Sequence, residues 1–284
     1  MEIPPGAEPI SFLGVDYIRL KTADGGDLFL TRFGLPFARH LAPENWHEPH
    51  WFAEKRIRLV GTSTIYRVPT RRLHGVSLNL VVRYSRVGQE LPLDPRTIQE
   101  NPDSEFNSPF EEFALVMELR AAHSSAIGPR VFTKKPLAIY VPGPQLQLWQ
   151  TGRLESKMAV KQVRHPEVAL EIRREYILLY GWIKGLNAVE ASRAYGITGT
   201  ASEKLLAETT LRVIEDLRHR GFRVLDMKPE HVVFRLCHDG SLLRQRNRNL
   251  AYALVDYELL ERLNAGHRSE TRSANNHARP QRSI

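Results

Sequence analysis

The stretch Val224–Phe234, with the sequence VLDMKPEHVVF, decides how this chain is interpreted. Its acidic residue, Asp226, lies where an apolar run gives way to a proline-containing loop. Thirty residues later (256 − 226), the segment Leu254–Leu260, LVDYELL, carries Asp256 at the end of another apolar run. Two such carboxylates suit phosphoryl transfer from a nucleotide, because one can orient and deprotonate the acceptor hydroxyl while the other holds the Mg²⁺ that bridges the phosphates.

A long helix is predicted directly before the first motif. Apolar residues recur at helical spacing over residues 205–220, and the acidic residues between them face the opposite side. Two basic residues followed by Gly221 are typical of a helix end. A second helix is predicted over residues 109–123, where Ser108 and Pro109 form a good N-cap and first-turn pair.

Strands are predicted in several short apolar runs of alternating polarity. Residues 16–20 and 27–32 flank the sequence ADGG at Ala23–Gly26, and this Asp-Gly pair predicts a hairpin. Residues 1–11 before it are expected to form a loose leader. Strands are also expected over residues 57–60, 64–68, 78–84 and 175–182, of which the first three would make an antiparallel sheet.

The two acidic motifs resemble those of protein kinases. The segment VLDMKPEH is similar to the catalytic loop H-R-D-L-K-P-x-N, and the triplet DYE at Asp256 is similar to D-F-G. The resemblance covers residues 56–262 and implies an α+β, two-lobed protein kinase-like fold with an antiparallel β small lobe. Because 28 residues follow Asp256 (284 − 256), the helical C-lobe is expected to be shortened, as in compact atypical kinases.

This resemblance also implies a division of the chain into four parts. These are an N-terminal extension with a β-hairpin (1–55), a kinase-like small lobe (56–184), a shortened C-lobe with the catalytic and metal loops (185–264) and a disordered basic tail (265–284). The segment Leu178–Gly185 would then contain the last small-lobe strand and the hinge that hydrogen-bonds an adenine.

The resemblance assigns roles to residues of the shortened C-lobe. Asp226 falls on the catalytic base, and Lys228 falls on the lysine that neutralises charge on the transferred phosphate. Asp256 falls on the metal-binding aspartate. His231 falls on the asparagine that binds a second metal, although imidazole suits Mg²⁺ less well than an oxygen ligand does. Glu258 stands where D-F-G has its glycine, so this loop gains an extra carboxylate.

The small lobe is expected to supply the groups that contact the phosphates of ATP. Two residues could match the lysine of the V-A-I-K motif, Arg83 in LNLVVRYS and Lys161 in MAVK. We favour Arg83, because only fourteen residues (175 − 161) separate Lys161 from the hinge strand, too few for a helix and two strands. The ion-pair partner would be Glu112 or Glu111. The phosphate loop is expected to contain Gly61, Thr62 and Ser63.

Composition and charge narrow the class of protein. The chain is 42% hydrophobic and 25% charged, with one cysteine, Cys237, and no apolar run long enough to span a membrane. Its first residues lack the features of a signal peptide, so a cytoplasmic protein without disulfides is expected. The net charge of +8 lies partly in the arginines of residues 244–248 and 266–284. Without interleaved aromatic residues, these arginines do not indicate nucleic-acid binding.

The sequence therefore predicts an ATP- and Mg²⁺-dependent phosphotransferase of the protein kinase-like type, whose acceptor is a protein or a small molecule. The alternative is a pseudokinase, which would use the same scaffold as a nucleotide-binding or regulatory interaction module. Arg83, His231, Glu258 and the glycine-poor phosphate loop favour this alternative, because each departs from the family pattern.

Overall fold

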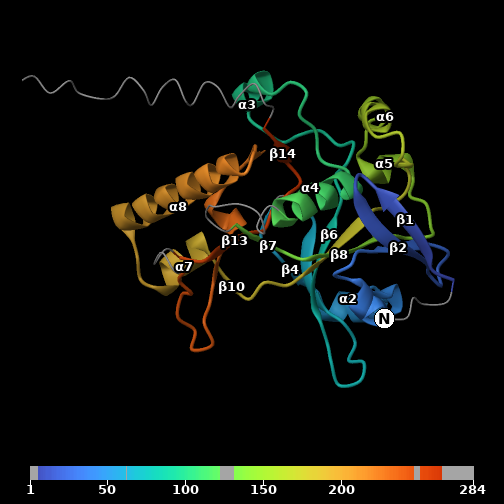
Figure 1. Ribbon diagram of the computed structural model, residues 1–284, viewed down its shortest axis with the longest axis horizontal. Coiled ribbons are helices and arrows are strands. Elements are labelled where there is room, and N and C mark those ends of the chain that lie inside the picture. Colours follow the sequence, from blue (N-terminus) through green and yellow to red (C-terminus); the bar gives the residue numbers. More distant parts are fainter. Residues whose placement is uncertain (1–5, 62, 122–130, 246–249, 264–284) are drawn as a thin grey trace, which may run out of the picture.

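The computed structural model describes residues 6–61, 63–121, 131–245 and 250–263 (Figure 1). They form a mixed α+β structure with one large antiparallel sheet, two small sheets and several helices. Within these four ranges, no helix combines the length and the apolar character needed to cross a lipid bilayer.

An eight-stranded sheet organises the first two thirds of the chain. Its strand order is β1-β2-β3-β8-β9-β6-β5-β4, and every neighbouring pair is antiparallel. The central strands β8, β9 and β6 are buried along almost their whole length, because their Val, Ile, Leu and Tyr side chains are covered on both faces. The strands are β1 (Glu8–Phe12), β2 (Val15–Lys21), β3 (Asp27–Leu30), β4 (Ile57–Arg58), β5 (Ile65–Pro69), β6 (Asn79–Tyr84), β8 (Pro136–Val141) and β9 (Ile177–Gly181).

Alternation along β6 gives this sheet two different faces. Val81 packs in the cluster that includes the apolar residues of helix α4 (Pro109–Ala121). Val82 packs on the opposite face with Trp46, which comes from the segment between β3 and β4. Because residues two apart on a strand point the same way, Arg83 lies on the face of Val81. The strand therefore directs Arg83 towards α4.

The second half of the chain contributes two small sheets and a long helix, α8 (Gly199–His219) (Figure 1). Val213 and Leu217 of α8 are buried in the core, and Tyr252 Oη donates to Asp216 Oδ2 of the helix at 2.7 Å. One sheet has the order β10-β12-β13-β7, in which only β13 and β7 are parallel, and the other pairs β11 with β14. The strands are β7 (Phe132–Thr133), β10 (Gly185–Asn187), β11 (Phe222–Val224), β12 (Val232–Arg235), β13 (Tyr252–Leu254) and β14 (Leu260–Arg262).

Most of the other helices are short. Side-chain caps fix the start of three of them: Glu48 accepts hydrogen bonds from two backbone amides of α2, Asp94 caps α3 and Asn187 caps α7. These helices are α1 (Ala38–Leu41), α2 (Pro49–Lys55), α3 (Pro95–Glu100), α5 (Leu148–Thr151), α6 (Glu155–Arg164) and α7 (Ala188–Ala194), with 3₁₀ turns at Leu35–Phe37, Pro43–Asn45 and Pro229–His231.

The structure confirms the main predicted elements. The predicted hairpin is β2–β3, the helix predicted over 109–123 is α4, and the helix predicted over 205–220 is α8. Helix α8 begins earlier than predicted, at Gly199. Its first turn was not predicted because the residues there are polar and exposed and carry no apolar period. The predicted loose leader is wrong in part, since Glu8–Phe12 forms β1 and pairs with β2.

Two further observations concern the predicted small lobe. The large sheet continues across residue 55, because β3 pairs with β8 and joins strands β1–β3 to the strands that follow. Met158–Lys161, the match to V-A-I-K that was not favoured, lies in helix α6 and not in a strand. The predicted tail, residues 265–284, lies outside the described residues.

Candidate functional site

Backbone pairing brings the loops of the two acidic motifs together. Asp226 follows β11 and Asp256 follows β13, while β11 pairs with β14 and β12 pairs with β13. A backbone hydrogen bond of 3.2 Å joins Leu225 N to Leu259 O. A second one, from Val255 N to the carbonyl oxygen of His231, measures 3.0 Å.

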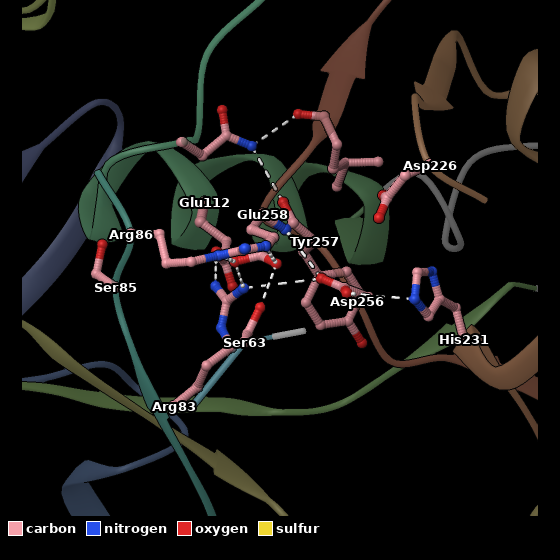
Figure 2. Close-up of polar contacts among 12 residues, drawn as sticks. Ser63, Arg83, Ser85, Arg86, Glu112, Asp226, His231, Asp256, Tyr257 and Glu258 are labelled. Carbon is pink, nitrogen blue, oxygen red and sulfur yellow. Dashed lines mark hydrogen bonds and ion pairs between the residues drawn. The ribbon is translucent and has the colours of Figure 1, made fainter. Parts of the chain in front are cut away.

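Asp226, His231 and Asp256 form a cluster of candidate metal ligands (Figure 2). One ligand atom of each residue lies within 4.8 Å of those of the other two. His231 Nε2 is 3.5 Å from Asp256 Oδ2. Within the described ranges, the buried atoms Asp226 Oδ1 and His231 Nδ1 have no hydrogen-bond partner. Because buried polar atoms are normally paired, the unpartnered Asp226 Oδ1 leaves the cluster with capacity for a ligand.

The two carboxylates of this cluster have pKa values that are shifted in opposite directions. Burial raises the pKa of Asp226, and the negative charge of Asp256 raises it further. Burial also acts to raise the pKa of Asp256, but His231 and Arg83 outweigh this effect and hold that pKa below its usual value. Carboxyl pairs with divergent pKa values are typical of sites where one group handles protons and the other keeps its charge.

A buried ion pair joins the large sheet to helix α4 beside this cluster. Arg83 Nη2 on β6 donates to Glu112 Oε2 on α4, and Tyr180 Oη donates to Glu112 Oε1. The side chains of Arg83 and Glu112 are 4% and 1% exposed. Arg83 Nη1 is also 3.7 Å from Asp256 Oδ1, so the ion pair contacts the acidic cluster directly. Of the two partners expected for Arg83, Glu112 is the one that forms the ion pair with it.

Glu258 occupies the space between Arg83 and the predicted phosphate loop (Figure 2). Its carboxylate accepts hydrogen bonds from Ser63 Oγ and from Arg86, whose Nε lies at 3.2 Å. Ser63 is buried and Gly61 is exposed, while Thr62 lies outside the described residues. Of the two described residues of the predicted phosphate loop, Ser63 therefore reaches the site.

Two residues that the sequence did not single out hold the loop after Asp256 in place. Asn107 Nδ2 donates to the carbonyl oxygens of Tyr257 at 3.1 Å and Leu260 at 2.8 Å. Lys134 N donates to Tyr257 Oη at 2.7 Å, and the Lys134 ammonium lies 4.8 Å from the ring centroid of Tyr180. Burial, together with the nearby charge of Arg83, lowers the pKa of Lys134 to about 7. Neither residue belongs to a motif that could have revealed it.

The two lysines that the sequence predicted, Lys228 and Lys161, lie in different surroundings. Lys228 Nζ is 3.5 Å from Asp226 Oδ2, and its side chain is half exposed, so it lies between the acidic cluster and solvent. Lys161 points from α6 to Glu111 Oε2 at 2.8 Å. Lys161 and Glu111 line a cavity of about 690 Å³ that has neither Asp226 nor Asp256 in its wall. Adjacent residues of α4 thus face different places, Glu111 towards this cavity and Glu112 towards Arg83.

The segment predicted as a hinge connects the large sheet to the four-stranded sheet. Strand β9 ends at Gly181 and β10 begins at Gly185, so three residues, 182–184, make the connection. Gly181 N donates to Lys135 O at 3.0 Å, and Trp182 N donates to Asn79 O at 3.1 Å. These two bonds fix the start of the connection against the large sheet.

Comparisons with known proteins give little similarity. No family model matches the sequence, and no curated protein matches it. Among solved structures, the crystal structure of Rad53 1-466 in complex with AMP-PNP matches with 11% sequence identity and a TM-score of 0.28. The match covers 86% of this chain and 61% of that chain. Similarity of this size does not define a shared fold.

Proposed function

We propose that this protein is a kinase-like phosphotransferase that moves the γ-phosphoryl group of ATP, with Mg²⁺, to a hydroxyl group. One observation carries the proposal: ligand atoms of Asp226, His231 and Asp256 lie within 4.8 Å of one another, next to the ion pair of Arg83 and Glu112. Kinase catalysis needs such a strand–helix ion pair together with a metal-binding aspartate. In this proposal the large sheet and α4 form the small lobe, residues 182–184 form the hinge, and residues 185–264 form a shortened C-lobe.

The donor set of the cluster fits a divalent cation. Asp256 supplies the carboxylate oxygen that Mg²⁺ prefers, and His231, whose Nε2 is 3.5 Å from Asp256 Oδ2, would supply a second ligand atom. A bound cation would neutralise charge on the phosphates of ATP. Asp256, whose lowered pKa keeps it ionised, would be the principal ligand. Arg83 would contact a phosphate beside the cation, because Arg83 Nη1 is 3.7 Å from Asp256 Oδ1.

Asp226 would orient the acceptor hydroxyl and accept its proton. The raised pKa of Asp226 brings this carboxylate closer to neutral pH, where a base is most effective. Lys228, 3.5 Å from Asp226 and half exposed, would stabilise charge on the phosphoryl group as it is transferred. The half-exposed side chain of Lys228 is compatible with an acceptor that arrives from solvent, such as a protein side chain, a sugar or a small alcohol.

Release of ADP from ATP in the presence of Mg²⁺ or Mn²⁺ tests the proposed function, and it should depend on pH in a defined direction. The base must be ionised, so turnover should fall as the pH is lowered through the pKa of Asp226. Because that pKa is raised, the fall should begin at a higher pH than for an ordinary aspartate. A rate that stays constant down to about pH 4 would contradict the role of Asp226.

His231→Asn should change the preferred metal ion. Imidazole suits transition metals, whereas amide oxygen suits Mg²⁺, so the wild-type cluster should favour Mn²⁺. We expect the ratio of turnover with Mn²⁺ to turnover with Mg²⁺ to fall about tenfold in the variant. His238→Asn, in the loop after β12, is a matched control and should leave this ratio unchanged. An unchanged ratio in His231→Asn would remove His231 from the metal site.

A pseudokinase is the second candidate, and one observation favours it. The carboxylate of Glu258 already contacts the side chains of Ser63, Arg83 and Arg86. These are the side chains that would face the phosphates of ATP. A protein of this kind would bind ATP without converting it. Binding of ATP, measured by calorimetry, with no release of ADP over hours would therefore select the regulatory module and exclude the phosphotransferase.

A further inference from the structure

Three side chains from two separate segments converge on the carboxylate of Glu258 (Figure 2). Ser63 Oγ and Arg86 Nη2 both donate to Oε1. Arg86 Nε donates to Oε2 at 3.2 Å, and Arg83 Nη1 lies 3.1 Å from the same oxygen. Glu258 thus fills a site that is built from one hydroxyl and two guanidinium groups.

The composition of this site is that of a phosphate-binding site. Guanidinium groups bind carboxylates and phosphates with the same forked geometry, and a serine hydroxyl donates to either anion. Glu258, Ser63 and Arg83 are 3%, 2% and 3% exposed, so the site excludes most water. Arg83 is buried and Arg86 is partly buried, and although Arg83 also pairs with Glu112, an anion that contacts both guanidinium groups is favoured in such surroundings. In this structure the chain itself supplies that anion.

The position of the site relates it to the candidate metal cluster. Glu258 lies two residues after Asp256, and Glu258 N is 3.3 Å from Asp256 Oδ1. Arg83 Nη1 contacts both carboxylates, at 3.7 Å for Asp256 and 3.1 Å for Glu258. A chain of phosphate groups could therefore reach from the cation at Asp256 to the guanidinium groups that now hold Glu258.

We propose that Glu258 is an internal substitute for a phosphate group, which occupies an anion site formed by Ser63, Arg83 and Arg86. A phosphate of a nucleoside triphosphate fills this site when the carboxylate moves out. The identity of the ligand depends on the function proposed above, and the anion site does not. Glu258 thereby restrains nucleotide binding, because the protein must first open the contacts of Glu258, which lowers the apparent affinity.

Glu258→Gln should expose the anion site with little change in shape. The neutral amide no longer competes for both guanidinium groups, so inorganic pyrophosphate should bind at least about tenfold more tightly than to the wild-type protein. Isothermal titration calorimetry with pyrophosphate, in buffer that contains a chelator, measures this without any contribution from the metal cluster. Equal affinity in the two proteins would overturn the proposal.

Glu261→Gln is the matched control, because Glu261 also accepts hydrogen bonds from a serine, Ser104, and an arginine, Arg223. It removes the same charge three residues away and should leave pyrophosphate affinity unchanged. An equal gain in both variants would indicate a general charge effect and overturn the proposal. Adding Arg86→Met to Glu258→Gln should abolish the gain, and a retained gain would contradict the assignment of Arg86.

A second variant covers the case in which Glu258→Gln does not fold. Glu258→Asp keeps the charge but is one methylene shorter, so it cannot reach Ser63 and both arginines together, and pyrophosphate should bind about threefold more tightly. Unchanged affinity in this variant would overturn the proposal. These results also distinguish the anion site from the proposed function. Tighter pyrophosphate binding by the Glu258 variants without ADP release by the protein would support the anion site alone. ADP release with unchanged pyrophosphate affinity in those variants would support the enzyme alone.

Discussion

Asp226→Asn is expected to lower the rate of phosphoryl transfer about 10³-fold while nucleotide binding is retained. Asparagine keeps the size of the side chain and can still accept a hydrogen bond, but it cannot take the proton of the acceptor hydroxyl. Binding should persist because Arg83 and Asp256, which would contact the phosphates and the cation, are unchanged. ADP release gives the rate, and calorimetry with ATP gives the affinity.

The same variant should be more stable than the wild-type protein at neutral pH. Since the pKa of Asp226 is raised in the folded protein, protonation of this group stabilises the fold. That contribution is complete below the pKa of the unfolded chain and is lost as pH rises through the folded pKa, so at neutral pH the ionised group is destabilising. Asparagine is uncharged throughout, and Tm should rise by roughly 2 °C or more.

Asp239→Asn is a suitable control for both measurements. Asp239 lies in an exposed turn after β12, where it accepts hydrogen bonds from Ser241, and its substitution should leave turnover unchanged. Wild-type turnover in Asp226→Asn would exclude Asp226 as the base. A fall in Tm at neutral pH would show instead that the Asp226 carboxylate stabilises the fold.

Asp256→Asn is expected to weaken divalent-cation binding at least about 100-fold and to abolish turnover. Asp256 would supply the negative charge that binds the cation, since its pKa is lowered and the carboxylate therefore stays ionised. The amide is neutral, so it also releases Arg83 from one of its three carboxylate neighbours. Mn²⁺ binding followed by electron paramagnetic resonance measures the loss. Affinity within about threefold of the wild-type value would exclude Asp256 as a ligand.

The local elements of the fold were predictable from the sequence, because each depends on a periodic pattern or a turn. The hairpin around Ala23–Gly26 and helix α4 are examples. Strand β1 was missed because Glu8–Phe12 is short, contains a proline and gains its partner only through β2. The similarity of Met158–Lys161 to V-A-I-K could not by itself identify a strand, since four letters do not distinguish a strand from a helix, and Arg83 was favoured on spacing instead.

The candidate site was predictable only where motifs and element order fix the contacts. The approach of Asp226 to Asp256 and the pairing of Arg83 with Glu112 follow from a strand-helix-strand order that the sequence reveals. The contacts of Glu258 do not, because its partners Ser63 and Arg86 are 195 and 172 residues away. Lys134 was missed since its burial arises from packing against Tyr180 and Tyr257, which no local pattern encodes.

Anomalous scattering from Mn²⁺ tests the central claim most directly, namely that Asp256 and His231 bind a divalent cation beside Asp226. Crystals grown with MnCl₂ and a non-hydrolysable ATP analogue should show a strong anomalous peak within about 2.5 Å of an oxygen of Asp256. The phosphates should lie on the side of Arg83. A crystal with the analogue bound elsewhere, or with no anomalous peak between Asp226 and Asp256 at saturating Mn²⁺, would contradict it.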